Sequence, residues 1–126
     1  MPITEEIYLT QEDIRQVQLA KGAIRAGIEL MARELGISMD AIDQCLLAGA
    51  FGSFLSPESA CKIGLLPAQL LPKIKAIGNA AADGANLIAA DPGLLRLADT
   101  LARSTEYLEL SSLGEFPKAF AKAMRF

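Results

Sequence analysis

The sequence predicts an α/β fold in which helix exceeds strand by a wide margin and the sheet is small and partly parallel. Two observations support this expectation. Apolar residues recur at three- and four-residue steps over residues 14–35, as they do on one face of a long helix. Two short runs typical of strands, Cys45–Ala48 and residues 73–77, are separated by a helical segment, and such a crossover favours parallel pairing. We expect residues 1–126 to form a single domain.

The N-terminal part of the chain is expected to hold a short strand and one long helix. Residues 7–9 include a β-branched and an aromatic side chain and predict the strand. Thr10 and Asp13 have the spacing of a capping box, so the helix begins there, and it ends at Gly36. Gly22 and Gly27 lie inside this helix at a cost of up to about 1 kcal/mol each relative to alanine. Their presence indicates close packing against backbone or against a ligand.

The rest of the chain alternates helices and strands. Ser56 is an N-cap residue that precedes a proline, which predicts a helix that ends at Gly64. The side chain of Asn79 can cap the helix that follows it or hold a ligand, with capping favoured. The Cys45–Ala48 run is continuously apolar, as in a strand buried on both faces. The remaining expected elements are a short helix at 39–43, helices at 80–90, 91–103 and 116–124, and a strand at 106–110.

The composition excludes several classes of function. Hydrophobic residues make up 52% of the 126 residues, which is ample for a core. The formal net charge is −3 and no run of lysine or arginine occurs, so we expect neither a nucleic-acid partner nor a membrane partner. The longest apolar run falls far short of the roughly 20 residues that span a bilayer.

The absence of histidine and the two isolated cysteines exclude further chemistry. Without histidine the chain has no Ser-His or Cys-His nucleophile pair and no histidine metal ligand. Cys45 and Cys61 supply neither a CxxC motif nor four thiolates for an iron–sulfur cluster. We therefore expect no metal site, and a cytoplasmic protein whose two thiols are reduced and buried.

A glycine-containing loop is the first candidate for a binding site. Gly49 and Gly52 directly follow the run Cys45–Ala48, and ligands of open α/β sheets bind beyond the carboxyl ends of strands. Glycines let the backbone approach a base or a phosphate closely. The same glycines could also make only a tight turn, and the spacing alone leaves both interpretations open.

A polar stripe on the long helix is the second candidate. Gln18, Lys21 and Arg25 lie at positions i, i+3 and i+7, so one amide and two cations share a face. Such a stripe could hold a ribose and the edge of a base. It could equally be a solvated helix face.

Five motifs in order carry a resemblance to a known family. They are residues 10–24, Leu47-Ala48-Gly49-Ala50-Phe51-Gly52, Ile63-Gly64-Leu65-Leu66-Pro67, Ile77-Gly78-Asn79-Ala80-Ala81 with Gly84-Ala85, and Tyr107-Leu108-Glu109-Leu110-Ser111. Together they cover nearly the whole chain and resemble the C-terminal part of the reductive activators of corrinoid proteins (RACo). The resemblance implies a helix-rich terminal lobe of the acetate and sugar kinase, heat-shock chaperone and actin superfamily (ASKHA), an actin-like ATPase domain of ribonuclease H-like type.

The resemblance also implies a function for the whole protein. Members of the family use ATP to drive an electron from a 2Fe-2S cluster to an inactivated Co(II) corrinoid. In the superfamily a long helix and a glycine turn after a buried strand hold the adenosine part of ATP or ADP. The positions that match these features are Gln18, Lys21, Arg25, Gly49, Ala50 and Gly52.

Several parts of the family pattern are missing from this chain. It has no four-cysteine cluster motif, so the 2Fe-2S cluster belongs only to full-length relatives, and it has no glycine-rich phosphate hairpin or catalytic acid. We therefore expect no catalytic residues and no ATP hydrolysis by this lobe alone. It is expected to be the terminal lobe of a larger protein or a short relative.

Two kinds of partner follow from this expectation. One is the remainder of the activator or its client corrinoid protein or metalloprotein. The other is a second copy, because removal of the neighbouring parts would uncover apolar surface near residues 7–9 or the terminal helix. The alternative function is a non-catalytic interaction or dimerisation module that has lost ligand binding.

Overall fold

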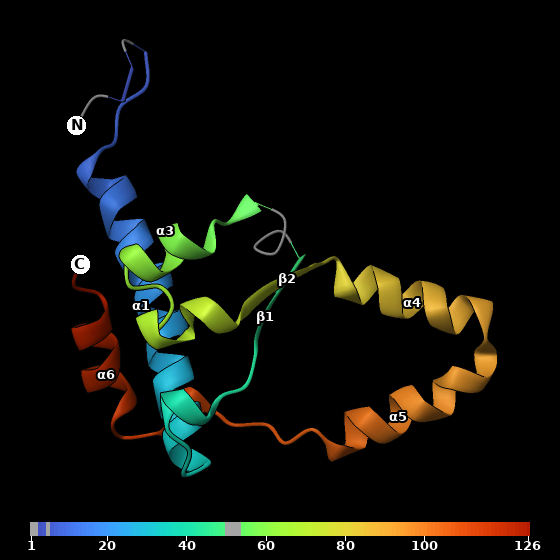
Figure 1. The fold of residues 1–126 in the computed structure, drawn as a ribbon. Coiled ribbons are helices and arrows are strands. Elements are labelled where there is room, and N and C mark those ends of the chain that lie inside the picture. The colour runs from blue at the N-terminus through green and yellow to red at the C-terminus, as the bar shows by residue number, and fades with distance from the viewer. Residues whose placement is uncertain (1–2, 5, 50–53) are drawn as a thin grey trace.

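The computed structural model describes residues 3–4, 6–49 and 54–126, and its centre is a single long helix (Figure 1). This helix, α1 (Gln11–Glu34), packs against α6 (Phe116–Ala123) near the C-terminus. The core next to it comes from α3 (Pro57–Lys62) and the segment that follows α3. Among the described residues no helix is both long enough and apolar enough to cross a membrane.

The capping box that defines the start of α1 is confirmed. The Thr10 hydroxyl oxygen accepts a hydrogen bond of 3.1 Å from the backbone N–H of Asp13, and the Thr10 N–H donates to the Asp13 carboxylate at 2.8 Å. Gly36, with a φ of 66°, follows the end of the helix, where the left-handed conformation favours glycine. The expected boundaries of this helix are therefore correct.

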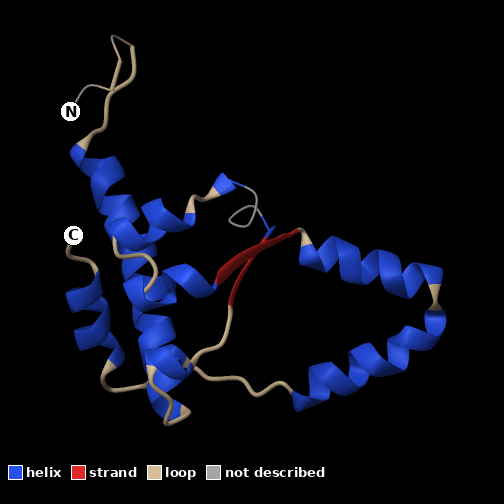
Figure 2. Cartoon of the chain, in the orientation of Figure 1, coloured by secondary structure: helices blue, strands red, loops and turns tan. Residues whose placement is uncertain are grey.

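The two expected strands form a parallel pair, as Figure 2 shows. In β1 (Cys45–Ala48) and β2 (Ile74–Gly78), Cys45 is paired with Ile74, and the register shifts between Leu47 and Ala48. The expectation that the first strand is buried on both faces is wrong, because half-buried and exposed residues alternate along it and Leu46 is 53% exposed. Within the described residues the core covers only one face of the pair.

A small apolar core joins the sheet to α1. Its buried residues are Ala60, Leu65 and Leu66. Ile24 and Ile28 of α1 pack against them, as do Leu47, Cys61 and Ile74. The cysteine thiols are free but only half-buried, which corrects the expectation of buried thiols. Burial nevertheless raises the pKa of both thiols.

Two of the expected strands are not formed. Around residues 7–9 only Tyr8 makes an isolated bridge, and residues 106–109 have no regular structure before η4 (Leu110–Ser112) begins. The short helix expected at 39–43 is a 3₁₀ turn, η1 (Met39–Ala41). A strand requires a neighbour to pair with its N–H and C=O groups, and the only strands paired among the described residues are β1 and β2.

Helices α4 (Ala80–Ala90) and α5 (Leu95–Ser104) form an arm that projects away from α1 (Figure 1). The short turn η3 (Pro92–Leu94) joins them, so the single helix expected at 91–103 is a 3₁₀ turn followed by an α-helix. The Asn79 side chain accepts a hydrogen bond of 3.2 Å from the N–H of Ala82, which confirms its role as a cap. Neither helix contains a buried residue.

Candidate functional site

The three residues of the polar stripe differ in their exposure. All three lie on α1. Gln18 is half-buried, Lys21 is only 1% exposed, and the Arg25 side chain is 24% exposed. The stripe is therefore not a fully solvated helix face.

Lys21 holds the last turn of α6 and the residues after it. Its Nζ donates hydrogen bonds to the carbonyl oxygens of Ala123 at 2.8 Å and Arg125 at 2.5 Å. It also lies 4.9 Å from the centre of the Phe126 ring, within the range of a cation–π contact. Burial lowers the pKa of Lys21 from its ordinary value, and the nearby Arg25 charge lowers it further.

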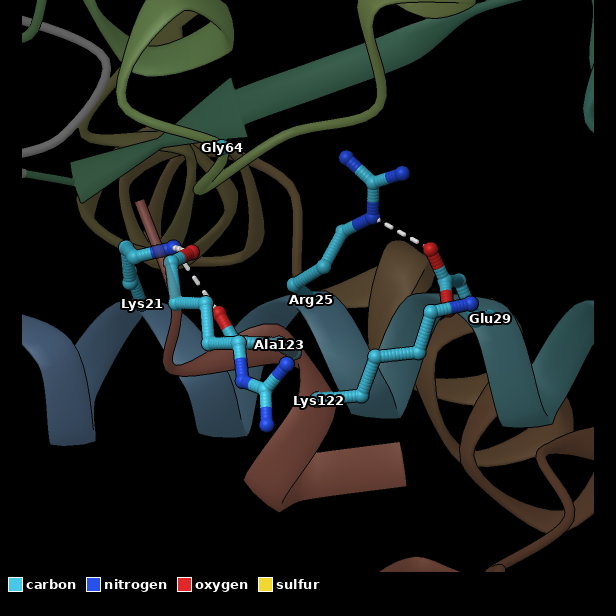
Figure 3. Close-up of a pocket in the computed structure, with 7 residues that line it drawn as sticks. Lys21, Arg25, Glu29, Gly64, Lys122 and Ala123 are labelled. Carbon is cyan, nitrogen blue, oxygen red and sulfur yellow. Dashed lines mark hydrogen bonds and ion pairs between the residues drawn. The ribbon is translucent and has the colours of Figure 1, made fainter. Parts of the chain in front are cut away.

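Arg25 is tied to its own helix. Its Nε lies 2.5 Å from Oε1 of Glu29, one turn further along α1. This pair and Lys21 line a cavity of about 220 Å³ (Figure 3). Residues from two other parts of the fold complete its lining: Gly64 from the turn after α3, and Lys122, Ala123 and Arg125 from the C-terminal segment.

Gly64 brings the turn after α3 close to the Lys21 ammonium. Its φ is 77°, and a Cβ atom built there would lie 3.3 Å from Nζ of Lys21. Any other residue would be strained and would also crowd the ammonium. The glycine therefore permits both the turn and the close approach.

The glycine loop is described only at its first residue. Gly49 directly follows β1 and has a φ of 68°, a left-handed backbone conformation that favours glycine. Ala50 and Gly52, the other two residues expected to contact adenosine, lie outside the described residues. Gly49 is not among the residues that line the cavity, and neither is Gln18.

The structure thus joins Lys21 and Arg25 at one cavity and adds residues that the sequence analysis did not select. Glu29 could have been found from its i, i+4 spacing to Arg25. Lys122 and Arg125 could not, because only the packing of α6 on α1 brings them there. The close packing expected at Gly22 is confirmed, since a Cβ atom on it would lie 2.8 Å from Cγ of Met124.

Comparison with known proteins gives matches to one group of proteins. Residues 2–126 match the family model described as the C-terminal domain of RACo, the ASKHA domain. The corrinoid activation enzyme RamQ of Eubacterium limosum is 34% identical over 119 residues. A reductase for the Co(II) methylated amine-specific corrinoid protein of Methanosarcina barkeri is 32% identical over 73 residues, which are 58% of this chain and 13% of that protein.

A solved structure extends the likeness to three dimensions. A reductive activator for a corrinoid, iron-sulfur protein shares 34% identity and superposes with a TM-score of 0.84 over 92% of this chain. The matched region is 18% of that activator, and the region matched in RamQ is 94% of this chain but only 20% of RamQ. This 126-residue chain therefore belongs to the family of the C-terminal domain of RACo, the ASKHA domain.

Proposed function

We propose that this chain is the adenosine-binding lobe of an ATP-dependent reductive activator of a corrinoid protein or a similar metalloprotein. The observation that supports this most directly is the placement of Lys21 and Arg25 at one cavity beside α1 in a chain of the ASKHA family. The proposed ligand is the adenosine part of ATP or ADP.

The proposed contacts with adenosine come from helix α1 and from the glycine loop after β1. Gln18, Lys21 and Arg25 would hold the ribose and the base edge from α1, and the loop of Gly49, Ala50 and Gly52 would approach the base. An ammonium has three N–H donors, and Lys21 uses two on the carbonyl oxygens of Ala123 and Arg125. The third N–H donates to no oxygen of the described residues, and we propose that it binds a ligand hydroxyl.

In a longer protein the lobe would serve the activity of its relatives. The names of these relatives describe corrinoid activation and reduction of a Co(II) corrinoid protein, so the proposed partners are the remainder of an activator and its client protein. The electron would come from a 2Fe-2S cluster carried elsewhere in such a protein. The two free cysteines fit a reducing compartment, and we place the protein in the cytoplasm.

A titration with adenosine tests the proposal. Weak binding is expected, with amide chemical-shift changes at residues 49–52 and along α1 from Gln18 to Arg25. Arg25→Ala should weaken the binding several-fold. Arg15→Ala, an exposed position earlier on α1, should leave it unchanged. Shift changes confined to other surfaces would contradict the proposal.

A second candidate function, an interaction module, is favoured by one specific observation. Leucines on the arm are more than half exposed: Leu87 at 61%, Leu95 at 60%, Leu97 at 55% and Leu101 at 58%. Ile7 and Tyr8 near the N-terminus are exposed as well, at 57% and 68%. Exposed apolar groups of this kind mark surfaces that associate, so self-association is the proposed behaviour of the isolated chain.

A further inference from the structure

We infer that the cavity between α1 and the C-terminal segment is an oxyanion subsite that takes a phosphate group. Four cationic residues line it (Lys21, Arg25, Lys122 and Arg125), together with one acidic residue, Glu29. The chain as a whole carries a net charge of −3, so this concentration of positive charge runs against the average of the molecule. Figure 3 shows Lys21, Arg25 and Glu29 on α1 and Lys122 on α6, beside the turn at Gly64.

The charges in the cavity are only partly neutralised. Glu29 is within ion-pair distance of Arg25 alone, and among the described residues no carboxylate pairs with Lys21, Lys122 or Arg125. Arg25 uses Nε on Glu29, and among the described residues its two terminal nitrogens donate to no other group. Several N–H donors with positive charge are therefore available to an anion.

Lys21 differs from the other cationic residues of the cavity because its ammonium is buried. Its ammonium is almost completely buried, and its two carbonyl partners fix its position. Because the surroundings of a buried charge are less polarisable than water, an anion there would interact with it more strongly than with an exposed lysine. Charge-assisted hydrogen bonds to a phosphate are also roughly twice as strong as neutral ones.

The size of the cavity suits a phosphate group. Its volume of about 220 Å³ is several times the roughly 30 Å³ that one water occupies in the liquid, so a tetrahedral oxyanion fits with waters to spare. The phosphate could belong to a nucleotide or be free in solution. Lys21 and Arg25 are also among the residues proposed to hold adenosine. The proposal that the phosphate belongs to a nucleotide therefore rests on the proposed function.

Three titrations of the full chain separate these sources: adenosine, ADP and inorganic phosphate, each without divalent cations so that the phosphates keep their negative charge. We expect ADP to bind about tenfold tighter than adenosine. We also expect phosphate to shift the amide signals of Lys21, Arg25, Gly64 and the segment 122–125. Equal affinities for ADP and adenosine, with no phosphate-induced shifts there, would overturn the inference and leave the adenosine proposal standing.

Two double variants that remove the same charge test whether phosphate binds at the cavity. Lys122→Gln with Arg125→Gln should reduce ADP affinity to that of adenosine and remove the phosphate-induced shifts. Lys75→Gln with Arg96→Gln removes the same charge from β2 and the arm and should change neither. If both double variants lose affinity equally, the attraction is a property of the whole surface and the subsite does not exist. If phosphate binds at the cavity and adenosine does not bind at all, the subsite stands and the adenosine proposal fails.

Discussion

The ammonium of Lys21 donates a hydrogen bond of 2.8 Å to the carbonyl oxygen of Ala123, a residue 102 positions further along the chain. Ala123 is the last residue of α6, where backbone carbonyls have no partner within their own helix. A side chain of α1 thus supplies the donor that the end of α6 lacks. The contact ties two distant segments at the edge of the candidate site.

Replacement of this lysine should destabilise the fold. Lys21→Met keeps the length of the side chain but leaves the carbonyls of Ala123 and Arg125 without their donor. We expect a loss of about 1–3 kcal/mol in the free energy of unfolding, measured by denaturant titration. Lys118→Met, at an exposed position of α6, is the control and should change stability by no more than about 0.5 kcal/mol. Equal stability of the two variants would show that Lys21 does not hold α6.

Two glycine substitutions should act in opposite directions. Gly22→Ala places a Cβ atom 2.8 Å from Cγ and 3.3 Å from the backbone nitrogen of Met124, so Met124 or the end of α6 beside it must shift. We expect this overpacking, about 1–3 kcal/mol, to exceed the gain in helix propensity of up to about 1 kcal/mol. Gly84→Ala in α4 meets no atom of the described residues within 4 Å and should stabilise the chain. Thermal unfolding of both variants tests this contrast, and a stabilised Gly22→Ala would contradict the close packing of α6.

The capping box of α1 should make the free energy of unfolding depend on pH in the acid range. The backbone N–H of Thr10 and the hydroxyl of Thr10 both donate hydrogen bonds to the Asp13 carboxylate. These bonds, the backbone one more strongly, hold the pKa of that carboxyl below its ordinary value of 3.8. The charged form is therefore favoured in the folded state. Its stabilisation is fully present above the unfolded pKa and is lost as the pH falls through the lower, folded value.

Asp13→Ala measures this contribution directly. The stability difference between the unchanged chain and Asp13→Ala should be constant near neutral pH and shrink as the pH falls below about 4. Asp43→Ala, which removes an exposed carboxylate outside any helix cap, is the control for the loss of one acidic residue. A difference for Asp13→Ala that persists unchanged into strong acid would refute the assignment.

The isolated chain should self-associate through its exposed apolar residues. Analytical ultracentrifugation at high micromolar concentration is expected to show dimers or larger species. If the arm forms the contact, the double variant Leu97→Ser with Leu101→Ser should weaken association. If the N-terminal segment forms the contact, the double variant Ile7→Ser with Tyr8→Ser should weaken it instead. Ala102→Ser, also exposed on α5, serves as the control. A strict monomer would contradict the interaction module.

Local signals in the sequence were sufficient for most helices. The capping residues Thr10, Ser56 and Asn79 each accept the expected backbone hydrogen bond, because a cap depends only on residues within one helical turn. The parallel pair was also predictable, since its strands are separated by a helical crossover. These features are determined over short stretches of chain.

Features that depend on distant neighbours were missed. Residues 7–9 and 106–110 have strand-like side chains, but among the described residues no strand lies beside them to complete a ladder. The burial of Lys21 was equally hidden, because it arises from α6, about a hundred residues away. For the same reason the sequence pattern indicated Lys21 and Arg25 but not Lys122 and Arg125, although all four line one cavity.

The pairing of α1 with α6 has a consequence for the order in which the protein is made. Synthesis runs from the N-terminus, so α1 leaves the ribosome long before Phe116–Ala123 of α6 exists. Until then the face of α1 around Gly22 and Lys21 has no covering helix, and the loop that must close to cover it is about a hundred residues long. Contacts this far apart in sequence slow folding. The nascent chain therefore passes through a stage in which residues 11–34 have been made but the helix that covers their Gly22 and Lys21 face has not.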